Sequence, residues 1–257
     1  MGTPPQDDTG AVDVHPLAEP FALTSDSYER GRPEYPDELL AFAAALAGLG
    51  PGKVAVDLGA GTGKFTRGLL RSGARVVEPL DKMRAEFARV LPDVECLAGG
   101  AHAIPAPDAS ADLVSCAQSF HWFAEEEALT EIARVLRPGG VLFLVWNHRD
   151  LSDPLQSLIE TIQDEHHAAG IPTSRTGEWQ ALMASAARFV PLEARHFVHT
   201  QHTDHETALA RVLSTTSVAR MDDLARRRIL TQVGAIVPPG TTREVPFVAD
   251  AYAFRRV

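Results

Sequence analysis

The alternation of strand and helix patterns between residues 36 and 147 is the feature that most limits how this chain can fold. Short apolar runs rich in β-branched residues alternate there with longer stretches of helical period. This order is typical of a parallel sheet, because parallel strands need long crossover connections that are usually helices. We therefore predict an α/β fold with helices on both faces of the sheet.

Five strands and their helices are predicted in this part of the chain. A helix is expected over 36–49, with Pro36 at its start and Gly50 at its stop. The predicted strands have the sequences KVAVDL, ARVVEP, DVECLAG, ADLVSCAQS and VLFLVWN. Helices are expected between them over 63–72, 81–91 and 125–140, and Asp81 is the expected N-cap of the second of these.

The rest of the chain predicts two late strands separated by helices. The expected strands are LEARHFVHTQH and EVPFVADAYAFRRV, and the expected helices cover 153–169, 177–187, 204–213 and 221–236. Strands that follow five parallel units favour an extra edge of the same sheet over a second domain. We expect a flexible tail over 1–24 and a single domain over 25–257, with 25–50 and 151–187 as lid and substrate-side additions.

Charge and composition favour a small-molecule partner. The formal net charge of −10 argues against binding to nucleic acid or to anionic membranes. The two cysteines, Cys96 and Cys116, lie in apolar runs without CxxC spacing, so neither a disulfide framework nor a zinc site is expected, and a cytoplasmic location fits. No apolar run approaches the roughly 18 residues that a membrane span needs.

The stretch VDLGAGTGKFT at 56–66 places three glycines directly behind the first predicted strand. A P-loop would need a glycine five residues before Gly63, where Leu58 stands instead. A dinucleotide fingerprint also fails, because Thr66 follows Gly61 and Gly63 where the third glycine should be. The spacing therefore argues against both phosphate cofactors.

Asp57 adds an electrostatic argument for a cationic cofactor. A carboxylate a few ångströms from a pyrophosphate would repel it by roughly 4 kcal/mol per charge pair at an effective dielectric constant of 20. S-adenosylmethionine instead carries an ammonium and a sulfonium, and the glycine turn leaves room for its amino-acid portion. Glu78, at the end of the second strand, is placed to accept hydrogen bonds from both ribose hydroxyls.

Four stretches in this order resemble the motifs of class I S-adenosylmethionine-dependent methyltransferases: VDLGAGTGKFT, VVEPLDKM, GAHAIPAPDASADLV and LRPGGVLFLVWN. YERGRPEYP, QSFHWF and WNHRDLSDP are similar to segments of the methyltransferase type 11 and trans-aconitate methyltransferase-like small-molecule group. The resemblance implies a Rossmann-like, seven-stranded, mainly parallel sheet with an antiparallel C-terminal strand. It covers most of the chain.

The resemblance also implies site residues. YERGRPEYP would fold over the cofactor as a lid, and QSFHWF would run beside the transferable methyl group. Gly100 and His102 stand where related proteins often have acids, so backbone groups at Ala101 and His102 are expected to hold the adenine. The residues expected to bind the cofactor are Tyr28, Arg32, Asp57, Gly59, Ala60, Gly61, Gly63, Glu78, Pro79, Leu80, Met83, Ala101, His102, Gln118, Ser119 and Phe120. Those expected on the substrate side are Tyr35, His121, Trp122, Asn147, His148 and Arg149.

His121 is the candidate general base, with a role in ordering its loop as an equal alternative. His148 and Arg149 are candidates for orienting an acidic substrate, or are simply solvated. The histidines of RHFVHTQHTDH do not predict a metal site, because only His196 and His202 share a strand face and they would lie about 20 Å apart.

These observations predict the in-line transfer of a methyl group from S-adenosylmethionine to a small metabolite, acidic or aromatic. The chain would act as a monomer or homodimer. Methylation of nucleic-acid bases is disfavoured, because QSFHWF lacks the Asn or Asp with two prolines and an aromatic residue that such enzymes usually place there. The alternative from another class is an S-adenosylmethionine-binding protein without methyl transfer, and a dinucleotide oxidoreductase is a more distant one.

Overall fold

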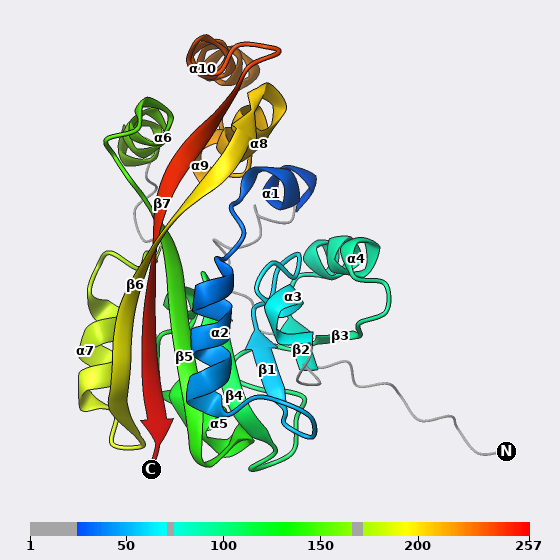
Figure 1. Ribbon diagram of the computed structural model, residues 1–257, viewed down its shortest axis with the longest axis vertical. Helices are drawn as coiled ribbons and strands as arrows, with labels where there is room; N and C mark the ends of the chain where they lie inside the picture. The colour runs from blue at the N-terminus through cyan, green and yellow to red at the C-terminus, as the bar shows by residue number, and fades with distance from the viewer. Residues whose placement is uncertain (1–24, 71–74, 166–171) are drawn as a thin grey trace, which may run out of the picture.

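The computed structural model describes residues 25–70, 75–165 and 172–257, so the predicted tail over 1–24 lies outside the described residues. Its sheet has seven strands in the order β3-β2-β1-β4-β5-β7-β6 (Figure 1). The strands are β1 Ala55–Leu58, β2 Arg75–Glu78, β3 Cys96–Ala98, β4 Ala111–Ala117, β5 Leu136–Arg149, β6 Phe189–Asp204 and β7 Thr242–Arg256.

The strand directions confirm the predicted fold class. β1 pairs in parallel with β2 and with β4, and the neighbouring pairs β2–β3 and β4–β5 are parallel as well. β7 is antiparallel to both β5 and β6. The sheet is therefore Rossmann-like and mainly parallel, with one antiparallel strand at the C-terminal end of the chain.

Two hydrophobic cores lie on opposite faces of the sheet. On one face, α2 (Asp37–Ala47) and α3 (Thr66–Leu69) pack against alternate side chains of the central strands, around Phe143. On the other face, α5 (Glu126–Val135) and α7 (Glu178–Ser185) pack around Trp146. α4 (Asp81–Val90) follows β2, and its Phe87 side chain lies under the glycine turn. Helices thus cover both faces, as the sequence predicts.

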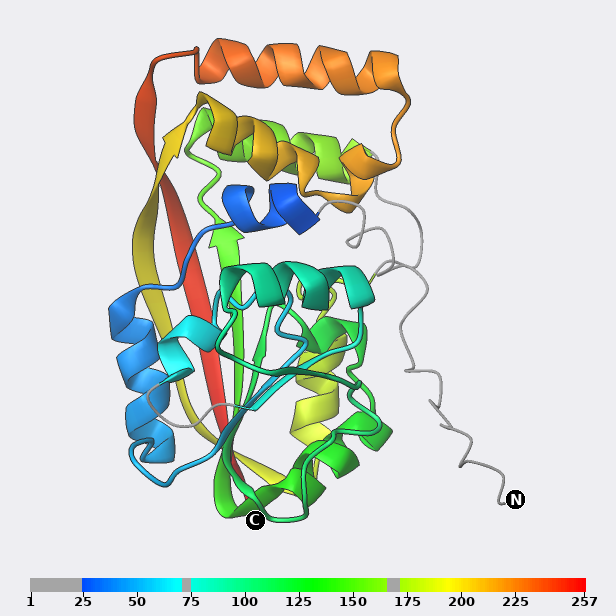
Figure 2. The same ribbon diagram turned by 90° about the vertical axis from the view of Figure 1, so that its right-hand side faces the viewer.

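A third apolar core lies at the far end of the long strands. It is built by a helical cap, which we define as α6 (Pro154–Glu165), α8 (His205–Leu213), α9 (Thr216–Ala219) and α10 (Asp223–Ile236). Val245 and Phe247 of β7 belong to the same core. Figures 1 and 2 show the cap above the carboxyl ends of the parallel strands, with α1 (Ser25–Gly31) between the cap and α4.

Several predicted helix ends are wrong, and two of them have a clear cause. The first helix ends at Ala47, because Gly48, with a φ of 60°, provides the left-handed C-cap in place of the predicted stop at Gly50. The helix after β4 ends at Val135, because residues 136–140 already belong to β5. Arg137 therefore lies in β5, and its guanidinium binds the Asp112 carboxylate at 2.8 Å.

The predicted N-cap at Asp81 is also wrong. Asp81 is the first residue of α4, Leu80 holds the N-cap position, and no side chain caps this helix. The Asp81 carboxylate still lies in the first turn, where it can interact with the helix dipole, and it forms an ion pair with Arg84.

The two helices of the 151–187 segment have different positions. α6 belongs to the helical cap, whereas Trp179 and Met183 of α7 are buried against the sheet. α7 therefore covers one face of the sheet, and the role of the 151–187 segment as a lid and substrate-side addition stays a prediction. The helical cap also contains α8, α9 and α10, and the sequence did not predict that these three helices lie on the substrate side.

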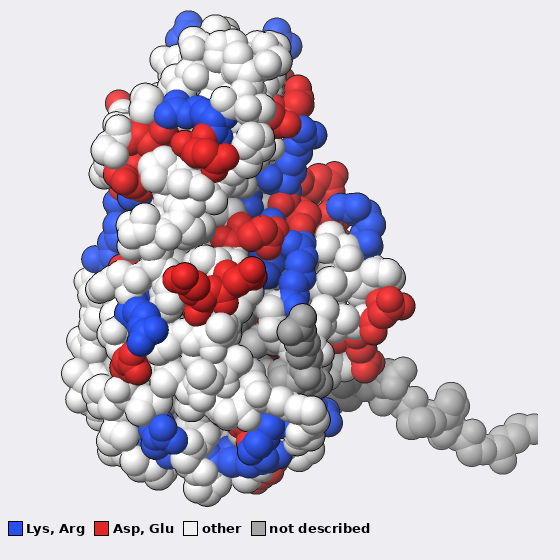
Figure 3. Space-filling model, in the orientation of Figure 1, with Lys and Arg blue, Asp and Glu red and all other residues white. Residues whose placement is uncertain are grey.

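The charged surface is mixed in sign. On the face in Figure 3, acidic and basic side chains are interspersed among broad uncharged areas, without a continuous basic patch. In the described part of the chain, no helix has the length and apolarity that crossing a bilayer requires.

Candidate functional site

The first cavity lies at the carboxyl ends of β1, β2 and β4, below α1, and has a volume of about 280 Å³. In open α/β sheets this edge is where ligands bind. Most of the expected cofactor residues line it. These are Tyr28, Arg32, Gly59, Ala60, Gly61, Glu78, Pro79, Leu80, Met83, Ala101, His102, Gln118 and Ser119, together with Tyr35, Trp122 and Asn147 from the expected substrate side.

The glycine turn brings backbone to the cavity wall. Gly59, Gly61 and Gly63 all have positive φ, of 72°, 59° and 90°, where a side chain would be strained. A Cβ at Gly59 would also lie 2.7 Å from Ser119 Cβ, and one at Gly63 would lie 2.7 Å from the Phe87 ring. Gly63 therefore shapes the turn without lining the cavity.

Asp57 lies behind the turn rather than on the wall. It is fully buried, and its two carboxylate oxygens accept hydrogen bonds from Thr66 Oγ1 at 2.6 Å and Ser115 Oγ at 2.8 Å. Burial raises the pKa of the Asp57 carboxyl to about 6, against the opposing effect of these two bonds. Any attraction on a bound cation would act through space rather than by direct contact.

Glu78 ends β2 with its carboxylate on the cavity wall. Gly61 N–H donates to one oxygen at 2.8 Å and Leu80 N–H to the other at 3.0 Å, so the side chain fixes the glycine turn to the start of α4. Each oxygen keeps a second lone pair for a ligand hydroxyl. Burial raises the pKa of Glu78 to about 7, because the charged form has lost most of its water.

The far end of the first cavity contains a carboxylate that the sequence analysis missed. Ala101 and His102 line this end as expected, and the His102 ring bonds the Glu125 carboxylate, which precedes α5. The expectation of backbone groups alone at this end is therefore incomplete. The sequence feature that could have indicated Glu125 is an acidic residue at the start of the helix that follows QSFHWF.

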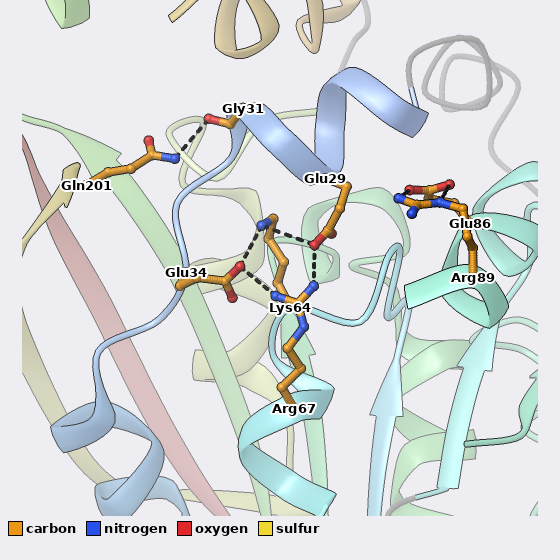
Figure 4. A network of polar contacts seen from close by, with 8 residues as sticks. All are labelled: Glu29, Gly31, Glu34, Lys64, Arg67, Glu86, Arg89 and Gln201. Carbon is orange, nitrogen blue, oxygen red and sulfur yellow. Dashed lines mark hydrogen bonds and ion pairs between the residues drawn. The ribbon is translucent and has the colours of Figure 1, made fainter. Parts of the chain in front are cut away.

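An ion-pair network joins α1 to the glycine turn (Figure 4). Lys64 Nζ lies 2.7 Å from Glu34 and 3.7 Å from Glu29, and Arg67 binds the same two carboxylates. Gly31 fits closely against α8, since a Cβ there would lie 2.3 Å from the Arg211 backbone nitrogen. These contacts hold Tyr28 of α1 and Arg32, which follows α1, over the first cavity.

The second cavity adjoins the first and has a volume of about 340 Å³. It lies between the ends of β4 and β5 and the helical cap, and His121, His148, Arg149 and Glu160 are among its lining residues. Five residues line both cavities, which places a shared wall between them: Arg32, Gln118, Trp122, Asn147 and Arg211.

Gln118 occupies a strained position on this shared wall. Its φ of 59° is left-handed, which costs a non-glycine residue on the order of 1 kcal/mol or more. Its backbone N–H donates to Val145 O at 2.9 Å and its side chain to Asn147 O at 3.3 Å. The end of β4 is therefore fixed to the end of β5, and backbone strain at such a place is typical of functional sites.

His121 is poorly suited to act as a general base. Its Nδ1 accepts the indole N–H of Trp146 at 3.1 Å, so in the neutral ring Nε2 carries the proton and can only donate. Burial also lowers the pKa of His121 to about 4. The side chain lines the second cavity as a neutral hydrogen-bond donor, which favours the alternative role of ordering this wall.

His148 and Arg149 both line the second cavity, and both have acidic partners. His148 Nε2 lies 3.4 Å from the Asp250 carboxylate, and Arg149 Nη1 lies 2.6 Å from Glu160. Burial lowers the pKa of Arg149 to about 10. These residues are therefore held at the site rather than simply solvated.

One further expected residue does not reach a cavity. Phe120 is fully buried in the sheet core, where it packs against Phe123, so with Asp57 and Gly63 it supports the wall from behind. Conversely, Arg211 and Phe247 line the first cavity although they lie far along the chain from the glycine motif. The signal for Arg211 was a single charge in the apolar run ALARVL.

The late histidines are dispersed along β6 and its flanks. His196 binds Asp250 at 2.6 Å, and His202 binds Glu244 at 2.9 Å. Within residues 25–70, 75–165 and 172–257, no three His, Cys, Asp or Glu side chains are grouped in a way that could hold a metal ion.

Comparisons with known proteins agree with this architecture. Residues 56–144 match the family model described as a methyltransferase domain. An uncharacterized methyltransferase-like protein of Schizosaccharomyces pombe is 46% identical over 141 residues, which are 52% of this chain and 54% of the relative. The chain thus spans about half the length of the curated relatives it matches.

Two solved structures share the fold. One, from Anaeromyxobacter dehalogenans and described as a candidate type II methyltransferase, has a TM-score of 0.64 and 23% identity, with 87% of this chain and 97% of that chain covered. A geranyl diphosphate methyltransferase in complex with S-adenosylmethionine has a TM-score of 0.51 and 17% identity, with 86% and 85% covered.

The narrower likeness to the trans-aconitate methyltransferase-like group stays a prediction, because none of these matches carries that name. The broader likeness to methyltransferases is carried by the family match over the glycine motif, by the relatives with methyltransferase names and by the strand order of the sheet. Residues 56–144 therefore match a methyltransferase domain, and the chain has the fold of solved methyltransferase structures.

Proposed function

We propose that the chain binds S-adenosylmethionine in the first cavity and transfers its methyl group to a small-molecule acceptor in the second. The observation that carries the proposal is the shared wall, because Gln118, Trp122 and Asn147 border both cavities. A donor in one cavity and an acceptor in the other would meet there. The mixed charge of the face in Figure 3 gives no support to a nucleic-acid acceptor there.

The residues of the first cavity fit the cofactor. The glycine turn can accommodate the amino-acid portion, and Glu78 has free lone pairs for the ribose hydroxyls. Asp57, buried behind the turn, would favour the ammonium and the sulfonium. Ala101, His102 and Glu125 can border the adenine ring.

The bound cofactor would supply an already activated methyl group, whose sulfur keeps the electron pair of the broken carbon–sulfur bond. The chain would contribute alignment and the exclusion of water. Trp122, Gln118 and Asn147 would direct the acceptor, and α1 would close the donor side. We expect no general base at His121, so acceptors that need no proton removal by the protein are favoured.

The alternative function is a protein that binds S-adenosylmethionine without transferring its methyl group. It is favoured by one observation: the described histidine and carboxylate side chains that line the second cavity already have partners. His121 accepts from Trp146, His148 binds Asp250, and Glu160 binds two arginines.

The proposed function is tested by binding followed by turnover. We expect calorimetry to show micromolar binding of S-adenosylhomocysteine and none of a nicotinamide dinucleotide. Incubation with methyl-labelled S-adenosylmethionine and a metabolite extract should then yield a labelled product. Tight binding without any labelled product would favour the alternative, and no binding of S-adenosylhomocysteine would overturn both.

Cofactor binding should depend on pH through Glu78. The ribose hydroxyls donate to the carboxylate form, and a pKa of about 7 leaves roughly one tenth of the groups ionised at pH 6. We expect calorimetry to give S-adenosylhomocysteine affinity about fivefold to tenfold lower at pH 6 than at pH 8. Glu78→Gln should bind more weakly and lose this pH dependence, and an unchanged dependence in the variant would contradict the assignment.

The ion-pair network of α1 should slow cofactor release. Arg67→Met removes the ion pairs with Glu29 and Glu34, and such pairs contribute about 0.2–1 kcal/mol each. We expect S-adenosylhomocysteine to dissociate about three to ten times faster in stopped-flow measurements. Arg89→Met is the matched control, because Arg89 pairs with Glu86 within α4 (Figure 4). Equal rates in the two variants would contradict this role.

His121→Gln should retain most of the activity. The glutamine oxygen can still accept the Trp146 indole N–H, and a neutral donor remains at the wall. Loss of a general base usually lowers kcat by about 10²–10⁴-fold. With the acceptor found in the extract assay, we expect a decrease of less than about tenfold and an unchanged pH profile. A larger loss, together with the loss of one limb of the profile, would restore His121 as the base.

A further inference from the structure

Arg211 carries a buried charge at the junction of the two cavities. The side chain extends from α8 and lines both cavities, and the residue is 4% exposed. Its Nε and Nη1 atoms are buried and have no hydrogen-bond partner among the described residues, and its guanidinium carbon lies 6.0 Å from the centre of the Phe247 ring. Buried arginines are usually paired, so the position is typical of a group that receives a ligand.

The neighbouring charges do not neutralise Arg211. Arg32 donates hydrogen bonds to the hydroxyl and the carbonyl oxygen of Ser214, both at 3.0 Å, and forms no ion pair with a carboxylate of the described residues. Arg149 has the Glu160 carboxylate as its acidic partner, but its Nε is buried and has no partner in the part of the chain that the structure describes. Glu160 is shared with a further arginine. Glu160 therefore forms ion pairs with Arg149 and Arg175, and none with Arg32 or Arg211. The pKa of Arg211 is lowered by burial and by Arg32 and Arg149.

The positions of the arginines separate a cofactor contact from an acceptor contact. Arg32 and Arg211 line both cavities, but Arg32 also lies beside Tyr28 and is the arginine expected to contact the cofactor. Arg149 lines the second cavity and not the first, and Arg211 lies between them. The N–H donors of Arg211 and Arg149 that have no partner among the described residues therefore lie at the second cavity as well, beyond the cavity proposed for the cofactor. Guanidinium groups bind carboxylates and phosphates through paired N–H donors.

We propose that Arg211 and Arg149 form an anion-binding subsite in the second cavity, which holds a carboxylate or phosphate group of the methyl acceptor. The proposal rests on the proposed function, since it takes the second cavity as the acceptor site. An anion there would satisfy the buried donors and anchor one end of the acceptor. The remainder of the acceptor would then lie toward Gln118 and Trp122 on the shared wall.

The subsite is tested with two simple anions. Protein saturated with S-adenosylhomocysteine is titrated by calorimetry with succinate, for a carboxylate, and with inorganic pyrophosphate, for a phosphate. We expect millimolar or tighter binding of one of them, which identifies the anion class. Arg211→Met and Arg149→Met should each weaken that binding at least tenfold.

Arg175→Met is the matched control for charge. Arg175 also lines the second cavity, but it is about half exposed and pairs with Asp164 as well as Glu160. We expect less than a threefold change in anion affinity in this variant. If all three variants weaken anion binding equally, the binding would come from the overall positive charge of the cavity and not from a specific subsite, which would overturn the proposal.

The affinity of Arg211→Met for S-adenosylhomocysteine shows whether Arg211 contacts the cofactor or the anion. Arg211→Met should bind it within about threefold of the original protein, which also shows that the variant is folded. A loss above tenfold, with unchanged anion binding in the loaded protein, would assign Arg211 to the cofactor and overturn the proposal. Failure of both anions to bind the loaded original protein would also overturn it.

Failure of the proposed function is distinguishable from failure of the subsite. If the original protein does not bind S-adenosylhomocysteine, the same titrations on the unloaded protein still decide whether Arg211 and Arg149 bind an anion. Unloaded Arg211→Met should melt about 2–4 °C higher, because a buried unpaired charge has been removed. A lower melting temperature would assign Arg211 to the packing of α8 instead.

Discussion

The antiparallel pairing of β7 with β5 and β6 is the constraint on which the rest of the structure depends. β7 pairs with β5 as far as Arg149 and continues along β6 to the pairing of Thr242 with Asp204. These strands extend past the carboxyl ends of the short parallel strands (Figure 1). They carry the helical cap over the edge where ligands bind in such sheets. Without this extension, the second cavity would have no upper wall.

The sequence predicted those parts of the site that depend on local backbone chemistry. The glycines at 59, 61 and 63 follow a buried strand, and their positive φ values agree with the reason for expecting glycine there. Glu78 reaches the cavity because parallel strands end at a common edge. Helix ends were less accurate, as at Gly48 and Val135, because strand pairing and turn geometry override local propensity.

The parts that were missed depend on contacts between distant segments. Arg211 reaches the cavities because β6 and β7 hold α8 above them, and no local pattern reveals that placement. The role of His121 depends on Trp146, which is 25 residues away and occupies the nitrogen that a base would need. A lone charge in an apolar helical run, as in ALARVL, was the one local signal that pointed to Arg211.

Two buried acids lie at the first cavity and arginines reach the second, and this distribution favours a cationic donor beside an anionic acceptor. Asp57 lies behind the first cavity and Glu78 on its wall, whereas Arg149 lines only the second cavity and Arg211 lines both. Each group loses solvation on burial, as the raised pKa values of the two acids indicate. Under the proposed function each ligand would offset that cost on its own side. Methyl transfer would then remove the sulfonium charge, so the attraction of the acidic side for the spent cofactor would weaken and favour its release.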